Sequence, residues 1–113
     1  MKTKKVNILG TDYTIIYASE KDKPKLDDVG ASGLAELYSK ELIINTDTTE
    51  NPDKCSFDSL GLFQNKVVRH EIIHAFFHES GLINYESDEV LVDWIAVQLP
   101  KIFKAVKEVE CDE

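Results

Sequence analysis

The sequence predicts an α+β domain in which a small, mostly antiparallel sheet packs on a long helix and on a C-terminal helical segment. Two observations lead to this fold class. Residues 4–46 form short runs of β-branched and aromatic residues broken by turn residues, whereas residues 58–110 repeat apolar residues at helical spacing. The 113 residues show no internal repeat or break in composition, so 1–113 is expected to be one domain.

The strands are expected as two hairpins. The runs 6–9 and 13–17 are rich in β-branched and aromatic residues, and the break at 10–12 between them predicts a turn. The runs 33–38 and 41–45 predict a second hairpin for the same reason.

The first helix is expected to follow two polar loops. Pro24 and Gly30 punctuate a loop over 19–30, and turn-forming residues predict another loop over 46–57. Apolar residues at helical spacing then predict a helix of about 22 residues over 59–80, ended by a glycine.

A second helix is expected from Ser87 to Leu99, with Pro100 either kinking it or beginning a short final helix to about Val109. The acidic residues 110–113 are expected to fray. Three apolar side chains of this segment are expected to bury against Phe76, Phe77 and the sheet: Leu91, Trp94 and Ile95.

Composition excludes several classes of partner. The 21 acidic and 13 basic residues give a net charge of −8, which repels a phosphate backbone, so no nucleic acid is expected. No apolar run approaches the roughly 20 residues of a membrane span, so no membrane is expected either. Residues 1–9 lack the apolar stretch of a secretory signal, which predicts a cytoplasmic protein. Cys55 and Cys111 have no metal-binding or redox spacing and are expected to be free thiols.

The residues that indicate chemistry are His70-Glu71-Ile72-Ile73-His74, an HExxH motif inside the first predicted helix. Residues four apart lie one turn apart on one helix face, so both imidazoles can bind one Zn²⁺ at about 2.0–2.1 Å. Glu71 is rotated about 100° around the axis, beside the water of the metal. The motif predicts a zinc site with Glu71 as catalytic base. The alternative is a chance pattern of solvated or core histidines.

A catalytic zinc ion requires a third protein ligand. His78 and Glu79 continue the same straight helix and are not expected to reach the ion. Glu89 follows the motif after a chain reversal and is the expected third ligand, with Glu86 as its main rival.

Asp93 lies one helical turn after Glu89. A carboxylate there is expected to accept a hydrogen bond from the ring nitrogen of His70 or His74 that does not face the metal. The alternative is that Glu86, Glu89 and Asp93 form a solvated acidic stripe.

The pattern His70-Glu71-x-x-His74 followed by Glu89-x-x-x-Asp93 resembles the gluzincin metallopeptidases. The longer runs 69–76, 79–82 and 92–96 are similar to small uncharacterised zincin-like proteins of phages and prophages. The resemblance implies a minimal zincin-like domain. It implies that His70, His74 and Glu89 are the zinc ligands. Glu71 would be the base and acid, and Asp93 the carboxylate that orients a ligand.

The resemblance also implies an extended rim strand before the zinc-binding helix, to which a peptide substrate can add as a further strand. Residues 30–38 are the matching segment. Tyr38, Tyr85 and His78 are candidates for a group that stabilises the oxyanion.

The expected function is a zinc-dependent peptidase of narrow specificity that acts on a protein or peptide substrate. One alternative is a zinc-stabilised protein-binding module of phage or prophage origin with little or no catalysis. Another is a phage or host-interaction protein without a metal. The residues favour no particular oligomeric state.

Overall fold

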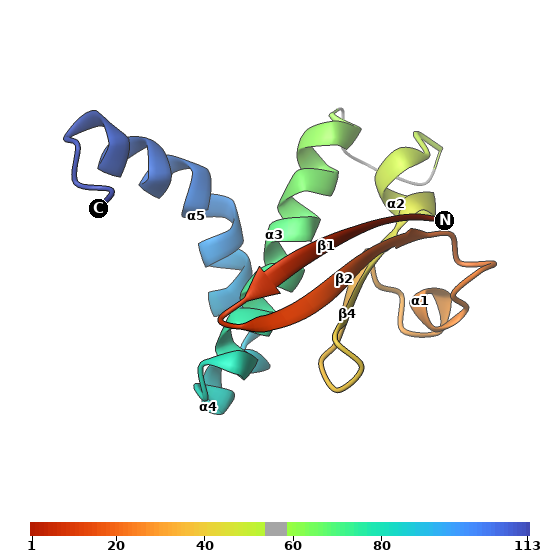
Figure 1. Ribbon diagram of the computed structural model, residues 1–113. Helices are drawn as coiled ribbons and strands as arrows, with labels where there is room; N and C mark the ends of the chain where they lie inside the picture. The colour runs from red at the N-terminus through yellow and green to blue at the C-terminus, as the bar shows by residue number, and fades with distance from the viewer. Residues whose placement is uncertain (54–58) are drawn as a thin grey trace.

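The structure is a computed structural model that describes residues 1–53 and 59–113. Its fold is α+β, as predicted. Four strands form one mixed sheet in the order β1-β2-β4-β3 (Figure 1). The elements follow one another as β1 (Lys2–Ile8), β2 (Thr11–Ala18), α1 (Lys25–Asp28), β3 (Gly33–Glu36), β4 (Glu41–Asn45), α2 (Thr46–Glu50), α3 (Leu60–Glu79), α4 (Ile83–Glu86) and α5 (Glu89–Glu108). No helix in the described ranges has both the length and the apolar character needed to cross a membrane.

Both predicted hairpins are confirmed, with small shifts of their ends. β1 and β2 pair antiparallel, and the turn falls on Leu9 and Gly10, which have φ of 51° and 92°. Such a left-handed pair matches the twist of a two-residue hairpin. β3 and β4 also pair antiparallel. The two hairpins join through a parallel pairing of β2 with β4, so two of the three pairings are antiparallel.

Three short helices lie where the sequence predicts loops or a chain reversal: α1, α2 and α4. The expectation of a turn-rich loop over 46–57 is wrong for residues 46–50, which form α2. Asn45 ends β4 and caps α2, because its side chain accepts a hydrogen bond from the backbone N–H of Asp47 at 2.9 Å. A single residue thus serves both elements, which a pattern of apolar residues does not reveal.

Helix α3 covers one face of the sheet. Val67 and Ala75 are buried in a core with side chains of β1, β2 and β4, namely Ile8, Tyr13, Ile15, Tyr17, Leu42 and Ile44. The opposite face is covered in part by Leu26 of α1, which packs on Ile16, Ala18 and Ile43. The helix that carries the HExxH motif is therefore fixed against the centre of the sheet.

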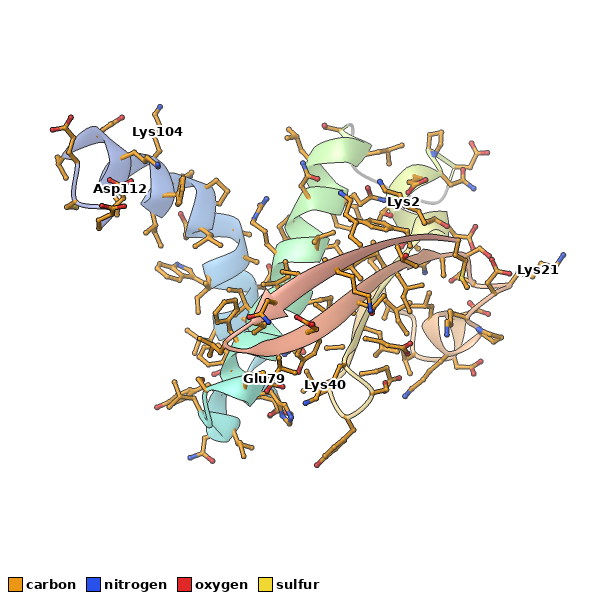
Figure 2. All side chains as sticks on the ribbon, in the orientation of Figure 1. Lys2, Lys21, Lys40, Glu79, Lys104 and Asp112 are labelled. Carbon is orange, nitrogen blue, oxygen red and sulfur yellow. The ribbon has the colours of Figure 1, made fainter. Side chains whose placement is uncertain are left out.

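The last turn of α3 is also tied to the sheet by charge. The Glu79 carboxylate accepts hydrogen bonds from Thr11 at 2.9 Å, Tyr13 at 2.6 Å and Lys40 at 2.8 Å. Figure 2 shows Glu79 and Lys40 close together below the sheet. The Lys40, Tyr13 and Thr11 hydrogen bonds lower the pKa of Glu79 to about 2. These contacts fix the end of α3 that follows the motif.

Helix α5 crosses α3 and then leaves it. Val92 and Ala96 are fully buried, whereas Trp94 is 57% exposed, so the expected burial of Trp94 is wrong. Trp94 lies two residues from each of these buried positions, about 200° around the helix, and faces the opposite side. Leu91 and Ile95 are half-buried.

Helix α5 continues through Pro100 without interruption. Proline has no N–H, so the Ala96 carbonyl four residues earlier lacks its helical donor. Arg69 of α3 replaces that donor, since its Nε–H donates to the Ala96 carbonyl at 2.7 Å. This contact compensates the helix for the proline and joins α5 to α3.

Candidate metal centre

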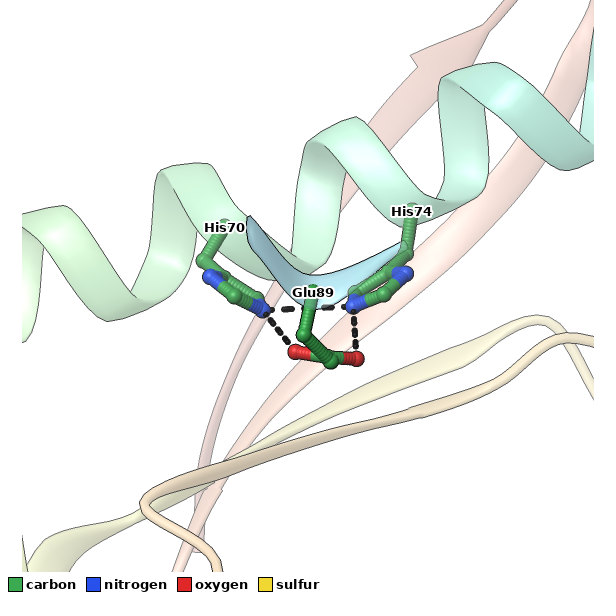
Figure 3. A group of neighbouring side chains, drawn as sticks. All are labelled: His70, His74 and Glu89. Carbon is green, nitrogen blue, oxygen red and sulfur yellow. Dashed lines mark hydrogen bonds and ion pairs between the residues drawn. The ribbon is translucent and has the colours of Figure 1, made fainter. Parts of the chain in front are cut away.

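Three side chains from two helices converge at one point. His70 and His74 lie one turn apart on α3, and Glu89 is the first residue of α5 (Figure 3). The two Nε2 atoms are 3.2 Å apart. Glu89 Oε2 lies 2.8 Å from His70 Nε2, and Glu89 Oε1 lies 2.9 Å from His74 Nε2. Among the described residues, these three form the group that could hold a metal ion.

The other ring nitrogen of each histidine faces a group that only accepts hydrogen bonds. His70 Nδ1 lies 3.0 Å from Asp93 Oδ1, and His74 Nδ1 contacts the backbone carbonyl of Glu86. Each Nδ1 must therefore carry the proton and donate it. If both imidazoles are neutral, each has a free lone pair on Nε2, so two lone pairs and a carboxylate would face one another with no donor between them.

A cation is the group that suits such a cluster. Two ligands that bind zinc at about 2.0–2.1 Å in a tetrahedral arrangement lie about 3.3–3.4 Å apart, close to the observed 3.2 Å between the Nε2 atoms. The contacts with Glu89 are shorter, but its side chain is exposed and has room to move outward. Two imidazoles and one carboxylate are a ligand set of catalytic zinc sites that leaves a fourth position open.

Asp93 has a second partner that the sequence analysis missed. Lys66, one turn before His70 on α3, donates to Asp93 Oδ1 at 2.9 Å. Partial burial opposes ionisation of Asp93, but the hydrogen bonds from Lys66 and His70 outweigh it and lower the pKa of the carboxyl. The i to i+4 spacing of Lys66 and His70 is the signal in the sequence that both residues share a face.

Glu71 is buried beside the cluster, and burial raises its pKa to about 7, although the nearby His70 opposes that rise. Its carboxylate makes no hydrogen bond within the described part of the chain. A Cβ atom on Gly33 of β3 would lie 2.6 Å from Glu71 Oε2 and 2.8 Å from Val67 Cγ1. Only glycine lets the strand pass this close, so Gly33 sets the distance between β3 and Glu71.

Two hollows meet at the cluster. One, of about 260 Å³, has β3 and Leu37 on one side and Glu86, Ser87 and Glu89 on the other. The second, of about 290 Å³, runs past Ser32, Phe63 and Lys66 to Asp93. Gly33, His70, Glu71 and Glu89 line both hollows. β3 is an edge strand of the sheet, so the segment expected to be a rim strand does lie along the candidate site.

Several candidates lie elsewhere. Glu86 does not join the cluster, because its carboxylate contacts His78 Nδ1 at 3.0 Å. The ring of Tyr38 contacts His78 edge-on, with ring centres 5.9 Å apart. None of the three residues considered as stabilising groups for the oxyanion lines either hollow: Tyr38, Tyr85 and His78. Cys111 is a free, exposed thiol outside the cluster, and Cys55 lies outside the described residues.

Comparisons with known proteins give no further assignment. No protein-family model matches the chain, and no curated protein or solved structure matches it.

Proposed function

We propose that the protein is a zinc-dependent peptidase of narrow specificity. The observation that carries the proposal is the orientation of both histidines, whose Nδ1 atoms are engaged by Asp93 and Glu86 so that both Nε2 atoms face Glu89. His70, His74 and Glu89 would be the zinc ligands.

The chemistry assigned to the residues follows from their places. A zinc ion held at such a site polarises a bound water molecule and lowers its pKa to about 7. The buried Glu71 would accept a proton from this water on a carboxylate oxygen as the water oxygen attacks the peptide carbonyl. Glu71 would then give the same proton to the leaving amine. One carboxyl group thus has to act first as base and then as acid.

The two hollows support a peptide as the substrate. They extend to both sides of the cluster along the edge strand β3, whose outer side has no neighbouring strand among the described residues. An extended peptide could pair with this edge and present its carbonyl to Glu71. The other edge strand, β1, carries Lys2, Lys4 and Lys5, charged residues that discourage strand addition.

Metal analysis tests the metal centre. Purified protein is expected to contain one zinc ion per chain, and a His70→Ala, His74→Ala double variant is expected to contain none. Replacing Lys25, whose ion pair with Glu36 is exposed, by Gln provides a control that should retain the metal. Equal zinc contents of the wild type and the double variant would show that His70 and His74 do not bind zinc and would refute the proposed metal centre.

Peptide cleavage tests the reaction. Glu71→Gln should retain zinc and the fold but lose about 10²–10⁴-fold in the rate of hydrolysis of a peptide selected from a library. Cleavage at the wild-type rate would exclude Glu71 as the base. Zinc binding by a wild-type protein that cleaves no library peptide would favour the alternative of a zinc-stabilised binding module.

A further inference from the structure

The connection between α3 and α5 has to place two groups of the candidate metal centre at once. It supplies the Glu86 carbonyl that accepts the hydrogen bond of His74, and it leads three residues later to Glu89. A shift of this connection would move both groups together. What fixes the connection therefore decides how well the centre is formed.

Apolar packing does little to fix it. No residue of α4 is buried, and the apolar side chains in the helix (Ile83 and Tyr85) and directly before it (Leu82) are exposed. The Tyr85 ring does lie 6.0 Å from that of Phe77 on α3, but Tyr85 is itself about half exposed to solvent. The free energy from burying apolar surface is correspondingly small here.

The sheltered contact of the connection is polar. His78 Nδ1 donates to Glu86 Oε2 at 3.0 Å, and the two side chains are only 20% and 24% exposed. The partner ring of His78, Tyr38, is 95% exposed and offers no comparable support. Glu86 thus meets α3 twice, through its carboxylate at His78 and through its carbonyl at His74, one turn apart.

We infer that His78 is a positioning residue that holds the α4–α5 corner against α3 through the Glu86 carboxylate, so that the Glu86 carbonyl meets His74 and Glu89 reaches both histidines. This inference rests on the proposed zinc site. His78 binds neither metal nor substrate in it. The third histidine of the helix, at the same four-residue spacing as the first two, acts on the second one through the backbone of Glu86.

Three variants test the inference in the full chain. His78→Phe keeps a ring but removes the donor, and Glu86→Ala removes the carboxylate but keeps the backbone carbonyl. His78→Asn restores an N–H close to the position of Nδ1 and should rescue the contact. Lys25→Gln, which breaks an ion pair between α1 and β3 that includes no residue of the centre or of the α3–α5 connection, is the matched control.

The first measurement needs no metal. In EDTA, hydrogen–deuterium exchange of the amides of residues 83–91 should be faster in His78→Phe and Glu86→Ala than in the wild type. His78→Asn and Lys25→Gln should exchange like the wild type. Unchanged exchange in both disrupting variants would overturn the inference, whether or not the protein binds zinc.

The second measurement is zinc affinity by competition titration. His78→Phe and Glu86→Ala should bind zinc about 10-fold more weakly, at the lower end of the effect of losing a group that orients a ligand. Faster exchange with unchanged affinity would also overturn the inference, because the pair would then only stabilise the corner. A wild-type protein without zinc affinity would instead refute the proposed function. The exchange experiment would then still show whether His78 and Glu86 hold the α4–α5 corner against α3.

Discussion

The two halves of α5 share an amphipathic pattern but differ in what surrounds them. In the first half, Val92 and Ala96 are fully buried against α3, and Glu89 and Asp93 contact the histidines of the motif. In the second half Phe103, which lies on the same face of the helix, is 60% exposed, and Ile102 beside it is also exposed. Figure 2 shows Lys104 on the part of the helix that projects from the rest of the chain, and Asp112 on the tail that follows the helix.

The difference teaches that the pattern of apolar residues specifies the helix but not its partner. Both halves are helical because both repeat apolar residues at helical spacing. Only the first half packs on α3. The two helices cross at the small residue Ala96, whose carbonyl also accepts the hydrogen bond from Arg69. The candidate site is built at this crossing and not further along α5.

The largest effect is expected from a charge in the crossing. Val92→Asp would bury a carboxylate next to α3 and should lower the unfolding free energy by about 4 kcal/mol or more. Arg69 is close by on α3 but already donates to the Ala96 carbonyl. The matched variant in the free half, Ile102→Asp, should change it by no more than about 0.5 kcal/mol. Urea denaturation followed by circular dichroism measures both, and equal effects would mean that the free half is covered in solution.

The Arg69 contact should depend on Pro100. Arg69→Met leaves the buried Ala96 carbonyl without a donor and should cost about 1–3 kcal/mol of unfolding free energy. Pro100→Ala restores the helical N–H, so the same Arg69→Met substitution in that background should cost clearly less. A double-mutant cycle with denaturant unfolding measures the coupling, and additive effects would show that Arg69 does not compensate for the proline.

Asp93 should matter for the metal, whereas an acidic residue at the other end of α5 should not. Asp93→Ala removes the acceptor of His70 Nδ1 and should weaken zinc binding about 10–100-fold. Glu108→Ala, at the exposed end of the helix, should leave the affinity unchanged. Competition titration separates the two roles, since a solvated acidic stripe would give the same small change for both.

The smallest effect is expected from removing the free half. A chain that ends at Pro100 loses Ile102 and Phe103, which are exposed, and keeps the buried residues of the crossing. Its unfolding free energy should fall by no more than about 1 kcal/mol, and its zinc affinity should not change. A larger loss in either measurement would assign the projecting half a structural role.

Local patterns were enough for most of the secondary structure. The hairpins and α3 follow from short runs of residues whose conformation depends on near neighbours, and they were predicted within a few residues. The short helices α1, α2 and α4 were not predicted, because too few residues contribute to each for a periodic pattern. The buried face of α5 was assigned incorrectly at Trp94, because a side chain that prefers burial is placed by the helix crossing and not by its own polarity.

The sequence by itself determined that His70 and His74 share one helix face, with Glu71 rotated away from them, because the α-helical repeat fixes those relations within a single turn. It left Glu86 and Glu89 as rivals, since the face that each presents depends on how the chain turns between α3 and α5. The tertiary structure places the Glu89 carboxylate beside both Nε2 atoms, whereas Glu86 contacts His74 through its carbonyl and His78 through its carboxylate. It also decided the parallel pairing of β2 with β4 and the closeness of Gly33 to Glu71. Contacts between segments far apart in the chain depend on how whole elements pack, and no local spacing of residues specifies that.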